Sequence, residues 1–223
     1  MVTLHHLENS RSQRILWLLE ELEIPYEIKL YRRDPETSLA PPELIAVHPL
    51  GKSPVITDGD RTLAESGAII EYLVENYGAG RMLPPPGSAE HLRYRYWLHY
   101  AEGSLMPFLL LSLLVRRIEN APVAFFVRPI ARGIAGKLKD TFVKPNIDRH
   151  LAFLEQALAE SPWFAGPDIS GADVQMSFPL EAAAVRTDMV KYYPNLNSWL
   201  ERIRSRPAYQ RALAKGGPFK LPG

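Results

Sequence analysis

The 223-residue sequence contains no cysteine. This absence excludes disulfide bonds, cysteine-ligated zinc, iron–sulfur clusters, a CxxC redox pair and a thiol nucleophile supplied by the protein itself. Any sulfur chemistry carried out by this chain therefore depends on a sulfur atom that another molecule brings.

The sequence also lacks a strong net charge and a long hydrophobic run. Its 26 basic and 25 acidic side chains give a net charge of +1, far from the basic excess typical of a nucleic-acid-binding protein. The longest apolar stretch, residues 105–115, is interrupted by Pro107 and Ser112 and is well short of the ~20 residues that cross a bilayer. Residues 1–6 contain neither a basic n-region nor an apolar h-region, so we expect no secretory signal. We therefore expect a cytoplasmic protein without nucleic-acid or membrane partners.

The charges are distributed unevenly along the chain. Residues 1–80 carry 7 basic and 13 acidic side chains, whereas the remainder carries 19 basic and 12 acidic ones. Between the two parts, three consecutive prolines and Gly87 are typical of a semi-rigid spacer. We expect a first domain over residues 1–80, a linker over 81–88 and a second domain over 89–223.

The first part combines strand and helix patterns. Residues 2–7 and 26–31 alternate between apolar and polar side chains, as strands do. The apolar residues between them follow helical spacing: Ile15, Leu18, Leu19 and Leu22. Pro25 ends this helix. A strand, a helix and a second strand in thirty residues predict a parallel strand pair.

A hairpin and a second helix follow. Residues 55–57 and 62–64 are predicted strands separated by an Asp-Gly-Asp turn. Ser66 is a plausible N-cap for a helix. The buried face of that helix is predicted to contain Ile69, Ile70, Leu73, Val74 and Tyr77. The first domain is thus predicted to be α/β.

The second part shows helical spacing and no convincing strand pattern. Ser170 to Asp173 has the form of a capping box, with Asp in place of the usual Glu or Gln. Ile169 and Val174 occupy the two positions of a hydrophobic staple around it. The second domain is predicted to be all-α, with one buried helix beginning at this box.

The order of motifs resembles that of a cytosolic glutathione S-transferase over essentially the whole chain. The motifs are Gly51-Lys52-Ser53-Pro54-Val55, then Leu63 to Ile69, the capping box, and Arg202-Ile203-Arg204-Ser205-Arg206-Pro207-Ala208. The segment Asn9 to Arg14 and the long insertion around residues 116–145 resemble the fungal and bacterial branch of the family. The resemblance implies a thioredoxin-like α/β N-terminal domain, an all-α C-terminal domain and a homodimer.

The resemblance also implies where glutathione binds. A cis Ser53–Pro54 bond is expected, and it would turn the Val55 main chain outward, where an extended peptide adds as a short strand. The alternative is that Pro54 only shapes a turn.

The two ends of glutathione have their own predicted contacts. Ser66, at a helix N-terminus, is expected to bind the γ-glutamyl carboxylate, and Glu65 to face the ammonium group. Lys52, assisted by His48, is expected to reach the glycyl carboxylate. The alternative for Ser66 and Glu65 is an ordinary helix cap beside a solvated acid.

The group that activates the thiol has two candidates. A free thiol is mostly protonated at neutral pH, so a hydrogen-bond donor near the start of the first helix would favour the thiolate. Ser10 is the first candidate, and Asn9 takes the position when a different loop length is counted back from Arg14. Ser12 is expected to cap the helix. The loop contains neither the Tyr nor the Cys found in other classes of the family.

A hydrophobic electrophile is expected to bind against the second domain. The candidate contacts there are Tyr96, Trp97, Tyr100, Met106, Phe108 and Leu109. Leu7 and Glu8 are further candidates beside strand one. No metal is expected, because His5 and His6 are adjacent on a strand and point to opposite faces.

The predicted function is that of a glutathione transferase, which stabilises the glutathione thiolate for attack on the electrophile. Glutathione-dependent peroxidase or disulfide-reductase activity uses the same thiolate. The alternative from another class is a glutathione-binding or ligand-carrying protein without turnover.

Overall fold

The computed structural model describes residues 1–37, 39–217 and 221. Its first part is a four-stranded sheet in the order β2-β1-β3-β4. Strands β1 and β2 are parallel, and the other two pairs are antiparallel. The strands are β1 (Val2–Leu7), β2 (Tyr26–Tyr31), β3 (Val55–Asp58) and β4 (Arg61–Ala64).

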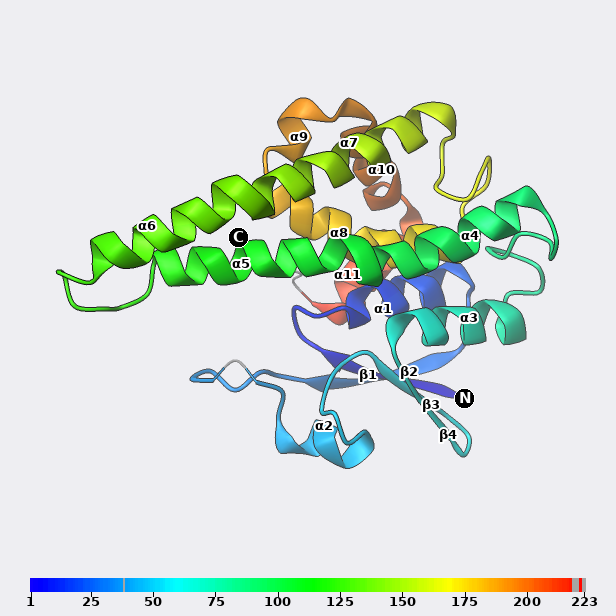
Figure 1. The fold of residues 1–223 in the computed structure, drawn as a ribbon. Helices are drawn as coiled ribbons and strands as arrows, with labels where there is room; N and C mark the ends of the chain where they lie inside the picture. The colour runs from blue at the N-terminus through cyan, green and yellow to red at the C-terminus, as the bar shows by residue number, and fades with distance from the viewer. Residues whose placement is uncertain (38, 218–220, 222–223) are drawn as a thin grey trace.

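Helices cover both faces of this sheet (Figure 1). Helices α1 (Ser12–Glu21) and α3 (Ser66–Tyr77) lie on the face toward the rest of the protein, and the short α2 (Pro42–Val47) lies on the other face. The predicted β–α–β unit, hairpin and following helix are confirmed. The periodicity of the apolar residues therefore determined this part correctly.

The second part is all-α within the described residues, as predicted. Its helices are α4 (Ala89–Tyr100), α5 (Met106–Glu119), α6 (Arg128–Leu138), α7 (Lys144–Glu160), α8 (Gly171–Arg186), α9 (Met189–Tyr192), α10 (Pro194–Arg204) and α11 (Pro207–Gly216). Two π-helical turns join them, η1 (Ala101–Leu105) between α4 and α5, and η2 (Lys139–Val143) between α6 and α7. Residues 218–220 and 222–223 of the predicted second domain lie outside the described residues.

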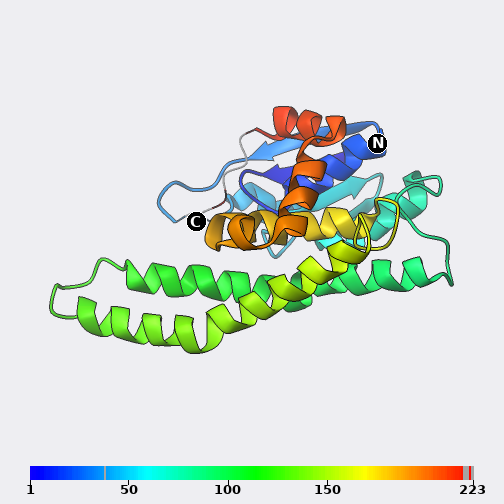
Figure 2. The same ribbon diagram turned by 90° about the horizontal axis from the view of Figure 1, so that it is seen from above.

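Two long helical rods dominate the second part. Figure 2 shows α4–η1–α5 beside α6–η2–α7, with the α5 and α6 ends projecting beyond the rest of the molecule. The first rod, Ala89–Glu119, has 31 residues, and its most apolar part has a mean hydropathy of 1.4. By length and composition alone it is sufficient to cross a membrane. However, 39% of that part is buried inside the protein, where Trp97, Leu105 and Leu109 belong to the main core.

Helix α1 is the most enclosed element of the fold. All residues from Ser12 to Glu20 are buried, and the helix packs against β1, α3, α8 and α11. Helix α11, at the end of the described chain, returns to lie on α1 (Figure 2). Since buried polar groups need hydrogen-bond partners, the polar residues of α1 must find theirs in distant parts of the chain.

The predicted capping box holds the start of α8. The carboxylate of Asp173 accepts hydrogen bonds from the Ser170 N–H (2.9 Å), the Phe164 N–H (3.0 Å) and the Trp199 ring N–H (3.2 Å). Burial raises the pKa of Asp173 to about 6, although these hydrogen bonds oppose the shift. One carboxylate thus joins the start of α8 to the loop before it and to α10.

Two details of α3 differ from the prediction. Ser66 is the first residue of the helix, and Glu65 occupies the N-cap position with a left-handed φ of 70°. The side chain of Tyr77 is not buried: the residue is 37% exposed, and its hydroxyl donates to Asp58. Tyr77 lies at the last turn of α3, where its polar end reaches the rim of the sheet.

An ion-pair cluster joins α1 to α11 and β2. The carboxylate of Glu20 accepts from Arg211 (2.7 Å), from Lys215 and from the Tyr26 hydroxyl. Burial alone would raise the pKa of Glu20, but the hydrogen bonds from Lys215, Tyr26 and Arg211 outweigh it and lower the pKa to about 2. The cluster therefore contributes stability while Glu20 is ionised.

We expect Glu20→Gln to lower the free energy of unfolding near pH 7 by about 1–2 kcal/mol, because a charge-assisted hydrogen-bond cluster is weakened. The folded-state pKa lies below the ordinary value of 4.5, so this contribution is complete above pH 4.5 and is lost as the pH falls toward 2. Urea unfolding at several pH values measures it. Asp148→Asn, in an exposed pair with Lys144, is the control. If the difference in unfolding free energy between Glu20→Gln and the unmodified protein did not change with pH, the stability could not come from ionised Glu20.

Candidate active site

The loop before β3 is fastened to the end of β1. The Ser53–Pro54 bond is cis, as predicted. The Ser53 hydroxyl donates to the His5 carbonyl (2.9 Å) and accepts from the Leu7 N–H (3.3 Å). The main-chain N–H and C=O of Ser53 make no backbone hydrogen bond within the described part of the chain. An extended peptide can therefore pair with Ser53 at this point.

The prediction that the Val55 main chain receives this peptide is wrong. Val55 lies inside the sheet, opposite His5 of β1 and Ala64 of β4. Strands already flank it on both sides, so no further strand can be added there. The exposed pairing position is two residues earlier, at Ser53.

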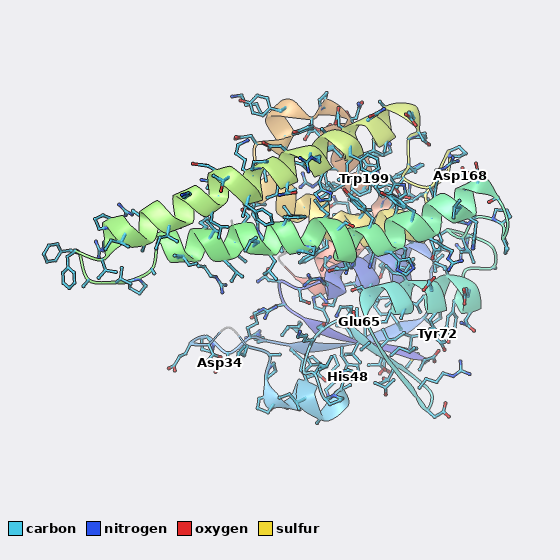
Figure 3. The ribbon with its side chains drawn as sticks, viewed as in Figure 1. Asp34, His48, Glu65, Tyr72, Asp168 and Trp199 are labelled. Atoms are coloured by element: carbon cyan, nitrogen blue, oxygen red, sulfur yellow. The ribbon has the colours of Figure 1, made fainter. Side chains whose placement is uncertain are left out.

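The start of α3 is open to an anion. No side chain caps this helix. Ser66 is buried, and its hydroxyl has no hydrogen-bond partner among the residues that the structure describes. Figure 3 shows Glu65 between the sheet and the α4–α5 rod. The first N–H groups of a helix and its dipole favour a negatively charged ligand.

His48 and Lys52 lie around the turn that leads to the cis proline. The His48 ring accepts from the Leu50 N–H (3.4 Å), and its carbonyl accepts from the Gly51 N–H (2.8 Å). Gly51 has a φ of 56°, and a Cβ there would lie 2.6 Å from Ile45. His48 lies on the α2 side of Glu65 (Figure 3) and shapes this turn, whereas Lys52 is exposed. Their roles toward a ligand stay predictions.

The β1–α1 loop contains both candidate thiol-activating residues. Asn9 is half-buried with a φ of 51°. Ser10 is 6% exposed, and its oxygen lies 2.8 Å from the Ser12 hydroxyl and accepts from the Ser12 N–H (3.2 Å). Ser12 does not cap α1, because it is the first helical residue. Ser10 instead supplies the oxygen that binds the first N–H of the helix.

A buried arginine, which sequence reasoning missed, anchors this loop to the second part. Arg14 of α1 donates to the Gln175 carbonyl (2.8 Å) and to Glu102 of η1 (2.5 Å), and Arg11 also donates to Glu102 (2.9 Å). Burial lowers the pKa of Arg14 to about 10, against the attraction of Glu102, so the guanidinium is charged at pH 7. The sequence did contain a signal for this contact, because Arg14 is a charged residue within an otherwise apolar stretch of the predicted helix.

Most of the predicted electrophile contacts belong to the core. Four of the six are buried: Trp97, Tyr100, Met106 and Leu109. Tyr96 is 49% exposed and Phe108 is half-buried, but their rings pack toward α7 and η2: Tyr96 against Phe153, and Phe108 against Phe142 and His150. Helical spacing could not separate the two groups, because the rod is enclosed on part of its surface only.

The two candidates beside strand one also have structural partners. Leu7 packs in a small cluster with Tyr31 and Leu44. The Glu8 carboxylate accepts from the Arg33 N–H (3.0 Å). On the opposite side of the β1–α1 loop, the Arg11 guanidinium lies 5.0 Å from the centre of the Phe178 ring of α8. Sequence reasoning missed this pair, which is distant along the chain.

The fold and these features define a class: a thioredoxin-like domain with a cis-proline loop, joined to an all-helical domain. A family model described as the glutathione S-transferase N-terminal domain matches residues 10–76, and one described as the glutathione S-transferase C-terminal domain matches residues 126–216. Together these matches cover helices α1 to α3, strands β2 to β4 and the helical part from residue 126 onward.

Individual relatives agree over the full length. Glutathione S-transferase 3 of Schizosaccharomyces pombe is 40% identical over 96% of this chain and 88% of its own length. Glutathione S-transferase 1 of Saccharomyces cerevisiae is 32% identical over 98% of both chains. The crystal structure of a glutathione S-transferase from Actinobacillus pleuropneumoniae superposes with a TM-score of 0.81 at 34% identity, covering 99% of this chain and 95% of that one. The chain belongs to the glutathione S-transferase family.

We expect Glu102→Gln to lower the free energy of unfolding by about 2–3 kcal/mol, because it leaves the buried Arg14 charge without its carboxylate. Thermal and urea unfolding near pH 7 measure the loss. Glu90→Gln removes an exposed carboxylate that pairs with Arg93, and should change stability by less than about 0.5 kcal/mol. Equal effects of the two substitutions would show that Arg14 does not depend on Glu102.

Proposed function

We propose that this chain, as a glutathione transferase, binds glutathione against the Ser53 main chain and stabilises its thiolate beside the start of α1. The observation that carries the proposal is the juxtaposition of two unsatisfied polar positions with the β1–α1 loop. The Ser53 main chain and the open start of α3 have no partner among the described residues, and Ser53 is bonded directly to the end of β1. A peptide along Ser53 thus has its middle residue next to the β1–α1 loop.

The ends of the peptide are matched by charge. The γ-glutamyl carboxylate would accept from the Ser66 hydroxyl and the first N–H groups of α3. The exposed Glu65 would face the neighbouring ammonium group, and Lys52 would reach the glycyl carboxylate with His48 shaping the turn. Lys52 and Glu65 are exposed, and the hydroxyl of the buried Ser66 has no other hydrogen-bond partner among the described residues.

We assign the thiolate donor to Asn9 rather than to Ser10. The Ser10 hydroxyl has a single proton and is already bonded to Ser12, whereas the Asn9 amide has two N–H donors. Fixed donors aimed at a developing charge act strongly where water is excluded. The electrophile would approach from the side of Arg11 and Phe178, which contact each other beside the β1–α1 loop. Because the chain has no cysteine, peroxide or disulfide reduction would proceed through the glutathione sulfur alone.

Titration of glutathione into single variants tests the proposal, with the ultraviolet absorbance of the bound thiolate followed against pH. We expect Asn9→Ala to raise the pKa of the bound thiol by about 1–2 units and to reduce conjugation of an aryl halide. Ser66→Ala should weaken binding about tenfold through loss of a charge-assisted hydrogen bond. Ser10→Ala should leave the thiol pKa nearly unchanged, as should Ser205→Ala, a remote exposed serine. An unshifted thiol pKa in the unmodified protein would favour a glutathione-binding protein without turnover.

We also propose that two copies of the chain form a homodimer in the cytoplasm. The acidic first part and the basic residues 116–144 of α5 and α6 are complementary in charge. The projecting rods also expose large apolar side chains: Leu110, Leu114, Ile118, Phe125, Phe126, Ile130 and Ile134. A second copy can cover both features at once.

Sedimentation of the full chain at low and high salt tests the role of charge in this association. We expect the dimer to bind about tenfold more tightly in low salt than in high salt, so that it dissociates at an about tenfold lower protein concentration in low salt. Phe125→Ser together with Phe126→Ser should weaken it at either salt concentration. A dimer indifferent to ionic strength would contradict the electrostatic part, and a monomer under all conditions would contradict the whole proposal.

A further inference from the structure

A chain of buried hydrogen bonds runs from the end of α11 to the β1–α1 loop. The Gly216 carbonyl lies 3.1 Å from Nε2 of His6, and Nδ1 of His6 lies 2.9 Å from the Ser12 hydroxyl. The Ser12 hydroxyl in turn lies 2.8 Å from the Ser10 hydroxyl. His6 and Ser12 are 2% and 0% exposed. These hydrogen bonds therefore connect the end of α11 directly to three neighbouring residues of β1, the β1–α1 loop and α1.

The chemistry of the groups at the two ends determines which group donates in each of these hydrogen bonds. A carbonyl only accepts, so Nε2 of His6 must carry the hydrogen. Burial lowers the pKa of His6, although the bond to Gly216 opposes the shift, so the ring is neutral at pH 7 and Nδ1 is an acceptor. The Ser12 proton therefore goes to Nδ1, or to the Leu7 carbonyl at 3.2 Å. In both cases the Ser12 oxygen can only accept from Ser10.

The Ser10 proton is consequently committed to Ser12. The Ser10 oxygen also accepts from the Ser12 N–H (3.2 Å), so both of its local contacts point into the protein. A hydroxyl has a single proton, and Ser10 cannot donate to a ligand without losing the bond to Ser12.

We propose that His6 is a positioning residue: held by the end of α11, it directs the Ser10 proton into the protein and away from the glutathione sulfur. This inference rests on the proposed function for the identity of the ligand. The direction of the hydrogen bonds themselves does not depend on any ligand.

The close approach of α11 requires a residue without a side chain at its end. A Cβ on Gly216 would lie 2.7 Å from both Gln13 and Leu16 and 3.2 Å from Nε2 of His6. Helix α11 therefore contacts the His6 ring only because residue 216 is glycine. Gly216→Ala is accordingly expected to displace the carbonyl that fixes the tautomer.

Nitrogen NMR of the histidine rings in the ligand-free protein tests the direction. We expect His6 to be neutral with the hydrogen on Nε2, and Gly216→Ala to shift its ring signals. The matched control is His5, which lies on the opposite face of β1 with Nδ1 2.8 Å from the Tyr31 hydroxyl. Its signals should not change. A hydrogen on Nδ1 of His6 would overturn the proposal, whatever the protein does with glutathione.

The thiol titration tests the consequence at the active site. Ser12→Ala removes the acceptor of the Ser10 proton, which can then turn to the sulfur and lower the pKa of the bound thiol by about 0.5–1 unit. Ser10→Ala added to Ser12→Ala should abolish this shift, whereas Ser10→Ala alone should have almost no effect. Ser10→Ala effects of the same size in both backgrounds would overturn the proposal. If glutathione does not bind at all, the proposed function fails, while the NMR result still decides the direction. If Ser12→Ala does not fold, the NMR measurement on His6 still tests the direction of the hydrogen bonds.

Discussion

The burial of α1 from Ser12 to Glu20 is the constraint on which the rest of the structure depends. A helix enclosed by β1, α3, α8 and α11 leaves its polar side chains little access to water, so they depend on partners in the protein. Within the described residues, Gln13 Nε2 and Arg14 Nε are the buried side-chain nitrogens of α1 that lack such a partner. Arg14 finds a carbonyl of α8 and a carboxylate of η1, and Glu20 finds two cations of α11. The contacts that join the two parts of the molecule are therefore the same contacts that satisfy α1.

The same constraint shapes the candidate site. The N-terminus of α1 is satisfied by Ser10 and Ser12, whose hydroxyls point inward because the nearest acceptors are inside. The start of α3, in contrast, is at the rim between the two parts and has no capping side chain. The protein's own side chains thus bind the start of α1, whereas the first N–H groups of α3 remain available to a ligand. An anion such as a carboxylate is suited to the second position.

The sequence was informative about features that depend on near neighbours. Apolar periodicity located the strands and α1, and the spacing of Ser170 and Asp173 located the start of α8. It was uninformative where a side chain meets a distant partner. Arg14 bonds Gln175 across 161 residues, and His6 bonds Gly216 across 210. The error at Val55 has a related cause: which residue of the motif is left unpaired depends on the positions of β1 and β4, and these are not encoded in the motif.

The absence of cysteine gives this arrangement its chemical meaning. The protein contributes no sulfur, and in the proposed mechanism it stabilises a foreign thiolate with fixed dipoles: a helix start, a strand main chain and an amide. A hydroxyl is a poorly defined donor for this purpose, because it rotates and its proton follows the strongest acceptor. In the ligand-free loop the acceptors that the Ser10 proton reaches are Ser12 and, behind it, His6. An amide holds its two N–H groups in one plane, so its donation to a sulfur does not depend on the direction of these hydroxyl hydrogen bonds.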